Sequence, residues 1–318
     1  NLSKYFSGIV AFENRNNSKA LDFFESSKIL INHHDQYLER FIMSLVFDDK
    51  VAKAINILKT NSKKTNTDFF ESYILLALDS LKKNNIIKAS EILSKIPEHL
   101  QKDQLNFIIV NSLKQYFDVF NTKTIKKREQ NFGDLSFITE TFQRCYLDDK
   151  NTGSFFSNLI NKGQADYSRY IFFYLSYLIE KKQIKEAEAI IDKLDYINTT
   201  LLLSQGKSWI ERNQYKEFSK VFLCSDRNDI VGEFLFLISN LYSSQKELEK
   251  SNFYLSLSTY LNPKFVFNLS LVVENLYLNQ NYEKSKLILK NFDKNHDFYF
   301  WYRIKKEAQI IVEEQDYE

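Results

Sequence analysis

The chain has 318 residues, which exceeds a usual single core of about 100 to 200 residues and predicts either two domains or an elongated array. Only 6 Gly and 2 Pro are present, too few for the turns of many β-hairpins or βα loops, so the composition predicts an all-α fold. The 43 Lys and Arg against 41 Asp and Glu give a net charge of +2, which excludes a broad field for nucleic acid or an anionic membrane. No run approaches the roughly 18 apolar residues of a transmembrane helix.

The sequence begins at Asn1 rather than at Met, which indicates that an upstream segment was removed. If that segment was a secretion signal, the compartment is the periplasm or envelope, and otherwise it is the cytoplasm, so localisation stays open. The abundance of Lys, Asn, Ile, Phe and Tyr is typical of AT-rich codons and indicates a bacterial source.

A small residue followed four positions later by a large apolar residue recurs along the chain. The first such pair is Ala20 and Phe24, and later pairs follow at intervals of roughly 31 to 35 residues, apart from one longer gap. In chain order the later pairs are Ala54 and Leu58, Ala89 and Leu93, Ala187 and Ile191, Phe218 and Phe222, Ser251 and Leu255, and Ser285 and Leu289.

The interval from Ala89 to Ala187 holds about three periods. Ser154 fills one of its two missing slots, and the other falls near Thr122, where the pattern is poorly formed. We therefore expect about nine units in a single array over residues 1–318, with degenerate repeats at about 100–165.

Each well-formed unit has a second apolar stretch upstream, as in ESYILLALDSLKK, RYIFFYLSYLIEKK and GEFLFLISNLYSSQ. Its apolar residues recur at intervals of three and four, which is the period of a helix and not of a strand. Short polar connectors such as KKNNI, EKKQI and NQNYE join the two stretches of a unit. The pattern therefore predicts helical hairpins, in which the small residue lets two helix backbones approach.

This period and residue pattern resemble the tetratricopeptide repeat, an array of helical hairpins. Phe218 stands where that family has a small residue, and the proline that closes a repeat survives once. The resemblance implies a right-handed α-solenoid of about nine hairpins. The matching residues are Gly8, Ala20, Phe24 and Ser27 in the first unit, and Ile238, Ser239, Tyr242, Ser251, Leu255, Ser258 and Pro263 in the unit that starts at Gly232.

The segment DFYFWYRIKKEAQIIVEEQ, residues 297–315, is predicted to be a first helix without its partner. It is either a terminal cap, with Lys305, Lys306, Glu313 and Glu314 turned outward, or a truncated repeat. The sequence does not decide between these two, and it leaves open self-association through such an unpaired helix.

In tetratricopeptide arrays the first helices line a concave groove that holds an extended or helical peptide, so the resemblance implies a protein-binding groove. The expected role is a non-catalytic scaffold for a protein or peptide partner. By register, the residues that we expect to line the groove include Tyr5, Phe12, Glu39, Met43, Arg169, Phe172, Lys207, Phe236, Asn240, Glu274 and Tyr277.

Candidate chemical sites are few. His33 and His34 are adjacent in a connector, whereas two metal ligands on one helix face need a spacing of about four, so a metal site is not favoured. Cys145 and Cys224 are more than two repeats apart, so we expect their Cα atoms to lie beyond the roughly 7 Å that a disulfide spans and both thiols to be reduced. The sequence has no phosphate-loop, dinucleotide or zinc-protease motif, and we expect neither catalysis nor a cofactor.

Two alternatives stay open. The run TKTIKKREQ holds four cations between Lys123 and Arg128, and pentatricopeptide arrays, also hairpins of about 35 residues, bind RNA. RNA is the less favoured partner because the base-reading position, generally polar in that family, is here filled by Tyr5, Ile74, Phe172, Leu203 and Phe236. The second alternative is that the chain is the interaction domain of a longer, multidomain protein.

Overall fold

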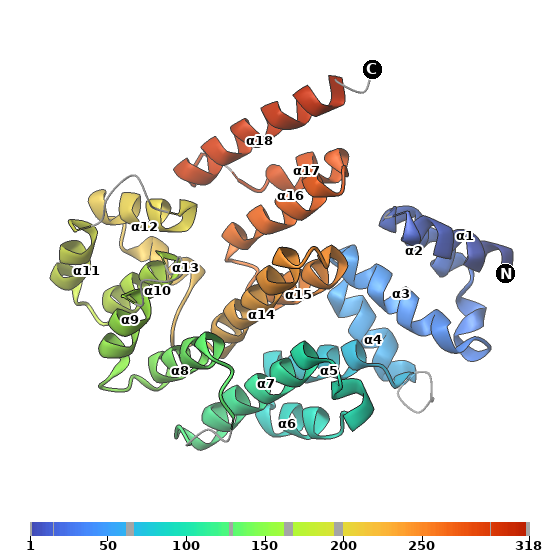
Figure 1. The fold of residues 1–318 in the computed structure, drawn as a ribbon, viewed down its shortest axis with the longest axis horizontal. Coiled ribbons are helices and arrows are strands. Elements are labelled where there is room, and N and C mark those ends of the chain that lie inside the picture. Colours follow the sequence, from blue (N-terminus) through green and yellow to red (C-terminus); the bar gives the residue numbers. More distant parts are fainter. Residues whose placement is uncertain are drawn as a thin grey trace.

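The computed structural model of the protein describes residues 2–14, 16–61, 67–126, 130–161, 168–193, 200–292 and 294–315. Within these ranges the chain forms 18 α-helices and no β-strand, which confirms the all-α prediction (Figure 1). The first nine are α1 (Leu2–Glu13), α2 (Asn17–Ser26), α3 (Asp35–Phe47), α4 (Val51–Asn61), α5 (Phe70–Lys82), α6 (Ile86–Ser94), α7 (Gln104–Thr122), α8 (Asp134–Leu147) and α9 (Thr152–Ile160). The others are α10 (Ser168–Glu180), α11 (Ile184–Ile191), α12 (Leu201–Glu211), α13 (Lys216–Val221), α14 (Arg227–Ser244), α15 (Leu248–Leu261), α16 (Leu269–Leu278), α17 (Tyr282–Leu289) and α18 (Asp297–Gln315). Short 3-10 helices occur at Lys28–Asn32, Glu98–Gln101 and Val266–Asn268.

Most helices are paired with their neighbour in sequence, and the repeating small residue lies on the second helix of each pair. The signature residue is fully buried in seven of these pairs, as the pattern predicts for a contact between two helices. These residues are Ala20, Ala54, Ala89, Ala187, Phe218, Ser251 and Ser285.

Close packing of the helices is clearest at two glycines. A Cβ atom on Gly8 of α1 would lie 2.8 Å from Cε1 of Phe24 on α2. A Cβ atom on Gly206 of α12 would lie 2.8 Å from Cδ2 of Phe172 and 3.3 Å from Cζ of Phe218. At both positions an aromatic ring occupies the space that a side chain on the first helix would need.

The hairpin turns form without glycine. In seven of the pairs, one turn residue adopts a left-handed backbone conformation, and the next amide donates back across the turn, as Asn85 N does to Ser80 O at 2.9 Å. Polar residues therefore adopt the left-handed conformation at the turn position where glycine is usual. These residues are Asp49, Asn84, Asp148, Lys182, Asn213, Lys246 and Gln280.

The region at about 100–165 departs from the predicted repeat. Ser154 is exposed, and the buried small residue of α9 is instead Thr152, four residues before the buried Phe156. Thr122 is the exposed last residue of the 19-residue helix α7, which has no second helix of its own before α8. The described residues therefore form eight pairs of sequence-adjacent helices, with α7 between the third and fourth pair and α18 after the last, where the sequence predicted about nine hairpins.

The hairpin α14–α15 lies in the middle of the molecule (Figure 1). Helix α15 packs against α3, α4 and α5, and α14 packs against α5, α7 and α8. The Lys82 ammonium lies 3.9 Å from the ring centroid of Tyr260, and Arg227 Nη2 donates to Asn84 Oδ1 at 3.1 Å. In an open solenoid each repeat contacts only its neighbours, whereas here a late hairpin covers the inner side of the arc from α3 to α8.

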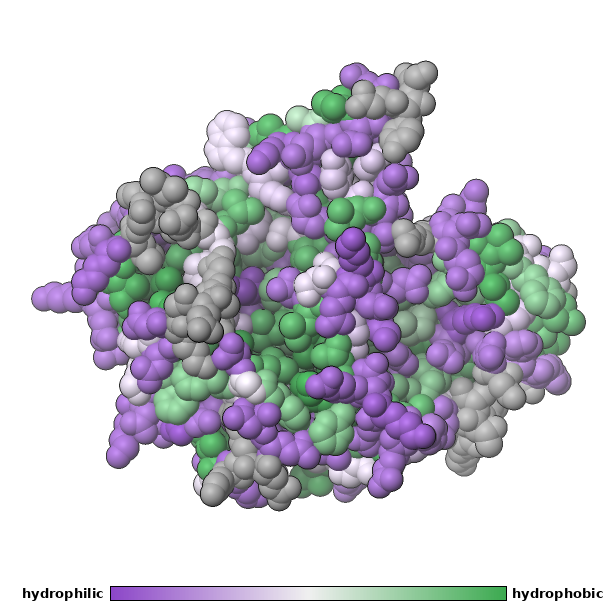
Figure 2. All heavy atoms as spheres, viewed as in Figure 1, coloured by the Kyte–Doolittle hydropathy of each residue, from purple (hydrophilic) through white to green (hydrophobic). Residues whose placement is uncertain are grey.

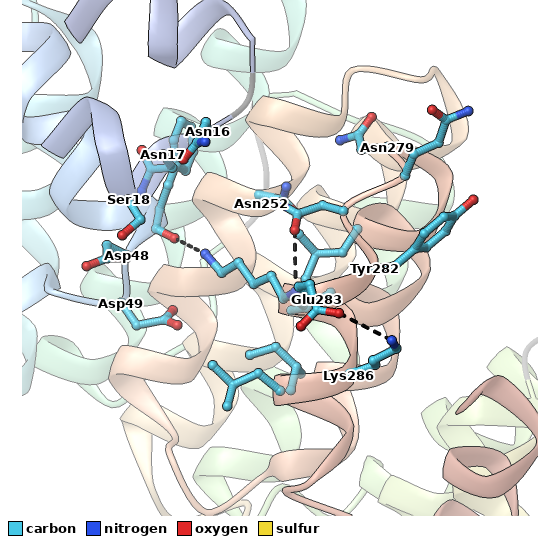
Figure 3. A pocket seen from close by; sticks show the side chains of 18 of the residues that line it. Asn16, Asn17, Ser18, Asp48, Asp49, Asn252, Asn279, Tyr282, Glu283 and Lys286 are labelled. Atoms are coloured by element: carbon cyan, nitrogen blue, oxygen red, sulfur yellow. Dashed lines mark hydrogen bonds and ion pairs between the residues drawn. The ribbon is translucent and has the colours of Figure 1, made fainter. Parts of the chain in front are cut away.

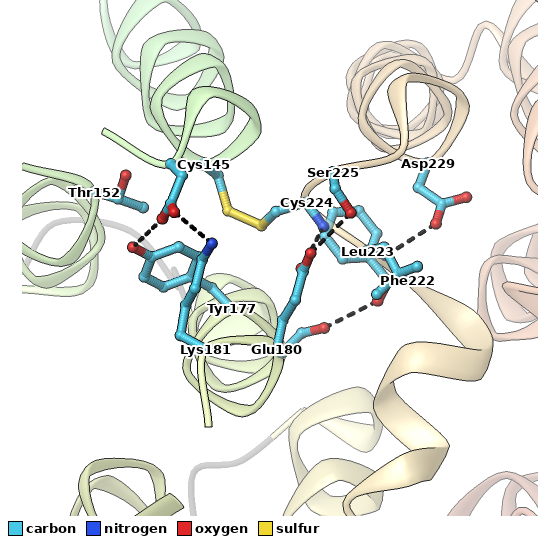
Figure 4. Close-up of a disulfide and its surroundings, with 12 residues drawn as sticks. Cys145, Thr152, Tyr177, Glu180, Lys181, Phe222, Leu223, Cys224, Ser225 and Asp229 are labelled. Atoms are coloured by element: carbon cyan, nitrogen blue, oxygen red, sulfur yellow. Dashed lines mark hydrogen bonds and ion pairs between the residues drawn. A yellow bond between two sulfur atoms is a disulfide. The ribbon is translucent and has the colours of Figure 1, made fainter. Parts of the chain in front are cut away.

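The prediction that both cysteines are reduced is wrong, because Cys145 and Cys224 form a disulfide with their Cα atoms 5.4 Å apart (Figure 4). In a straight array the two cysteines would lie far apart, but the chain turns back and places the segment before α14 beside α8. Glu180 of α10 holds the same segment by accepting from Cys224 N at 3.1 Å and from Ser225 Oγ at 2.8 Å. The disulfide therefore closes a loop that contains α9 to α13.

Candidate functional site

A groove with a volume of about 1190 Å³ lies between the N-terminal hairpins and the C-terminal helices. One wall is formed by the turns α1–α2 and α3–α4, and the other by α15, α16, α17 and part of α18 (Figure 3). In Figure 2 the outline of the molecule is indented between these two arms. Segments at opposite ends of the sequence thus face each other across one opening.

The interior of the groove is largely apolar. Phe12 of α1 stacks on Phe47, with ring centroids 5.9 Å apart and an interplanar angle of 24°. Leu287 at the mouth is 61% exposed. Several other apolar side chains here are only partly buried, so a ligand in the groove would remove them from water. The apolar lining consists of Phe12, Phe47, Leu255, Leu269, Val272, Leu276, Leu287, Ile288 and Ile311.

The rim of the groove is rich in side-chain amides. Asn17 Nδ2 donates to Ser44 O at 2.9 Å, whereas Asn17 Oδ1 is shielded from solvent and has no hydrogen-bond partner among the described residues. A buried acceptor of this kind is unfavourable unless a water or ligand donor reaches it. The amides that line the groove are Asn14, Asn16, Asn17, Asn252, Asn279, Gln280 and Asn281.

Two lysines of α17 hold the groove together, Lys284 across the two walls and Lys286 within the C-terminal wall. Lys284 Nζ donates to the backbone oxygen of Phe47 at 2.8 Å, and Lys286 Nζ donates to both carboxylate oxygens of Glu314 at 2.8 and 2.7 Å. Desolvation raises the pKa of Asp49, although part of that residue reaches solvent; Lys284 opposes the shift and the Asp48 carboxylate adds to it. The groove therefore combines carboxylates and ammonium groups that already compensate each other in part.

Three of the residues predicted to line a groove lie together, but in the interior. Arg169 Nε and Nη2 donate to the two carboxylate oxygens of Glu233, each at 2.7 Å, and Arg169 Nη2 also donates to Asn268 Oδ1 at 2.7 Å. The guanidinium carbon lies 3.8 Å from the ring centroid of Phe236, and Phe172 is fully buried among other aromatic rings. These residues hold α10, α14 and the segment before α16 together and are not open to a ligand.

Two further predicted residues, Tyr5 and Lys207, are also buried. Tyr5 Oη accepts from Arg40 Nη1 at 3.1 Å, and Lys207 Nζ lies 4.0 Å from a carboxylate oxygen of Glu211. Tyr5 packs against Phe24 and Tyr37 of the first two hairpins, so neither residue lines an open groove.

Helix α18 covers Glu274 and Tyr277. Glu274 accepts from Tyr302 Oη at 2.6 Å and from Lys306 Nζ at 2.9 Å. Tyr277 Oη donates to Glu313 at 3.1 Å, with the Lys306 ammonium 4.3 Å from its ring centroid. Lys306 and Glu313, expected to point outward from a cap, instead fasten α18 to α16.

The other predicted residues are scattered. Phe12 lines the groove described above, Met43 is half-buried against the core, and Glu39 and Asn240 are exposed on separate helices. The expected concave lining is therefore not one surface in this fold.

The remaining candidate sites have local partners. His34 Nδ1 lies 3.5 Å from Tyr5 Oη, and no group of three or more His, Cys, Asp and Glu suited to a metal occurs within the described ranges. Lys126 pairs with Asp118 at 3.0 Å, and the Lys123 ammonium lies 4.3 Å from the Tyr146 ring centroid. Lys127 and Arg128 of the basic run lie outside the described residues. In the described part of the chain no helix is long and apolar enough to cross a bilayer.

The sequence pattern missed the groove because its rim comes from connectors. The connections α1–α2, α3–α4 and α16–α17 each join the two helices of a hairpin, and the fold brings residues from all three to the same opening. Comparison of the chain with known protein families, with curated proteins and with solved structures found no match.

Proposed function

We propose that the protein is a non-catalytic binding module that receives a segment of another protein in the groove between the N-terminal hairpins and α15 to α18. The resemblance to tetratricopeptide arrays supports this class of function, since such arrays bind peptides. The observation that carries the proposal is an opening with partly exposed apolar side chains inside and side-chain amides on its rim.

The chemistry of the groove suits a peptide. The free energy of binding becomes more favourable by about 25 cal/mol for each Å² of apolar area that a ligand removes from water. Side-chain amides both donate and accept, as the backbone of an extended peptide requires. The groove, with a volume of about 1190 Å³, has room for several residues of a peptide.

The disulfide supports one compartment over the other. Disulfides persist in oxidising compartments and are rare in a reducing cytoplasm. The Cys145–Cys224 bond therefore favours the periplasm, envelope or exterior as the place where this binding module works.

The test is selection of peptides from a displayed random library against the 318-residue chain, followed by binding measurements on purified variants. Leu287→Glu places a charge at the groove mouth. It is expected to weaken the binding of the selected peptides at least tenfold. Leu278→Glu is the matched control, because Leu278 is 65% exposed but does not line the groove. Equal binding to both variants, or no selected peptide at all, would reject the groove as the binding site.

A further inference from the structure

The groove is acidic, although the whole chain carries a net charge of +2. Among the described residues that line it, carboxylates outnumber ammonium groups by six to three, and both walls contribute carboxylates. A groove with this excess of negative charge attracts a cationic segment and repels an anionic one. The six carboxylates belong to Asp48, Asp49, Glu249, Glu283, Glu307 and Glu314.

Most of these carboxylates already have a cationic partner within the fold. Such pairs compensate their own charge and add little to the attraction of a ligand. The pairs, with N–O distances of 2.6 to 3.2 Å, are Lys286 with Glu283 and Glu314, Arg303 with Glu307, and Lys50 with Asp48. A cationic ligand therefore finds its partner among the carboxylates outside these pairs.

Asp49 lies outside them and forms no ion pair with the described residues. It is the left-handed residue of the α3–α4 turn, and its side chain points from that turn toward the C-terminal wall (Figure 3). The Ser256 hydroxyl and the more distant Lys284 ammonium favour the carboxylate, but burial outweighs both and raises the pKa of Asp49. A cation that reached Asp49 from the groove would stabilise its charged form.

The same corner of the groove already accommodates one ammonium group. Lys284 Nζ crosses from α17 and donates to the backbone oxygen of Phe47 at 2.8 Å. Phe47 is the last residue of α3, so this oxygen is one of the carbonyls at the negative end of the helix dipole. The backbone and the Asp49 carboxylate thus favour positive charge at the same place.

We propose that the segment received in the groove carries a Lys or Arg side chain between apolar residues, and that this cation pairs with Asp49. The inference rests on the proposed peptide-binding function and names the class of peptide. Successive side chains of an extended segment point to opposite sides. A cation directed at Asp49 therefore leaves its two neighbours directed at the apolar residues that α15 and α16 contribute to the groove, among them Leu255 and Leu276.

The experiment selects peptides from a displayed random library on the 318-residue wild type and then measures their binding to purified variants. Asp49→Asn removes the charge and keeps the turn, because asparagine adopts the left-handed conformation readily. Asp22→Asn is the matched control, since Asp22 is exposed on α2 and does not line the groove. Circular dichroism and urea unfolding verify that both variants are folded.

The selected peptides are expected to be enriched in Lys or Arg flanked by apolar residues. Replacing that cation by norleucine should weaken binding to the wild type by about tenfold or more, because a desolvated charge pair is lost. Binding to Asp49→Asn should be weakened to a similar extent and should no longer depend on the replacement. Asp22→Asn should bind both peptides as the wild type does.

Failure of this inference is distinguishable from failure of the proposed function. An added carboxylate can attract a cationic peptide, so Leu287→Gln, which adds no charge, serves here as the variant of the apolar lining. If Leu287→Gln weakens the selected peptides while Asp49→Asn binds them as the wild type does, the groove binds peptides but the role of Asp49 is rejected. Enrichment of acidic or uncharged peptides rejects the cationic class. A library that yields no peptide rejects the proposed function and this inference together.

Discussion

The guanidinium of Arg169 meets the carboxylate of Glu233 through two parallel hydrogen bonds of 2.7 Å, and the pair lies in the interior of the molecule. Burial raises the pKa of Glu233, and Arg169 opposes that shift by favouring the carboxylate. The pair joins α10 to α14, two helices from different hairpins. The ionic contact is therefore one of the points at which the late hairpin is fixed to the rest of the fold.

Removing one partner of this pair should be worse than removing both. Arg169→Met leaves the Glu233 carboxylate buried without its cation, and we expect the free energy of unfolding to fall by about 3 to 5 kcal/mol. The double variant Arg169→Met with Glu233→Leu leaves no buried charge and should regain most of that loss. Urea unfolding of the wild type and three variants, with Glu233→Leu as the third, completes the cycle. A double variant as unstable as the sum of the two single variants would show that the groups do not act as a pair.

Gly206→Ala should destabilise the protein although alanine favours helices. The added Cβ atom would lie 2.8 Å from Phe172 and 3.3 Å from Phe218, both fully buried, so overpacking is expected to cost about 1 to 3 kcal/mol. Gly232→Ala is the matched control, because its nearest neighbours would be at an ordinary 3.4 Å. In the control the higher helix propensity of alanine should keep stability equal or raise it slightly. Thermal unfolding of both variants measures the two effects. If Gly206→Ala were as stable as the wild type, close packing at Gly206 would be rejected.

Asp229 should make stability fall as pH rises toward neutrality. It is buried at the start of α14, accepts from Leu223 N at 2.9 Å, and has a pKa raised to about 7 by burial, with Asp226 and Glu180 adding to the shift and Lys264 opposing it. The folded state thus binds a proton that the unfolded state releases near pH 4. Its contribution is complete below the unfolded pKa and is lost as pH rises through about 7.

The matched variant is Asp229→Asn, whose side-chain oxygen still accepts from Leu223 N but does not ionise. Relative to this variant, the wild type should lose up to about 2 to 3 kcal/mol of stability between about pH 5 and about pH 8. Urea unfolding at both pH values measures the difference. A constant difference between the two proteins would mean that Asp229 does not titrate in this range.

Reduction of the disulfide should weaken the fold without removing its helices. The bond closes a loop across a separation of 79 residues, and releasing such a constraint on the unfolded chain is expected to cost roughly 2 to 4 kcal/mol. The double variant Cys145→Ser with Cys224→Ser should unfold at a lower urea concentration, with similar circular dichroism at low urea. Dithiothreitol should lower the midpoint of the wild type and leave that of the double variant unchanged. Insensitivity of the wild type to reductant, with thiol titration confirming reduction, would contradict this expectation.

The sequence predicts what is local in this fold and misses what is distant. The spacing of Ala20, Ala54 and Ala89 locates hairpins because the contact that needs a small residue lies within one unit. Phe172 and Phe236 were interpreted as part of a binding surface, but they are apolar because other parts of the same chain cover them. The spacing of apolar residues cannot distinguish a helix face that binds a ligand from a helix face that other helices of the same chain cover.

The groove was beyond prediction for a related reason. Its rim consists of turn residues such as Asn17 and Gln280, and in an asparagine-rich chain these carry no signal of their own. Only the return of α15 to α18 toward α1 makes them neighbours. The disulfide was mispredicted because the chain turns back before α14 and brings Cys224 beside α8, which shortens a distance that a straight array would have made long.

The central position of α14–α15 also has a consequence for synthesis. Translation proceeds at about 5 to 20 residues per second, so Leu261 follows the end of α8 by a delay on the order of ten seconds. During that delay the helices from α3 to α8 have left the peptidyl-transferase centre, while the hairpin that covers their inner side is still unmade. The nascent chain therefore presents an apolar surface that the finished protein conceals, and this is the interval in which a chaperone that holds apolar segments would act on it.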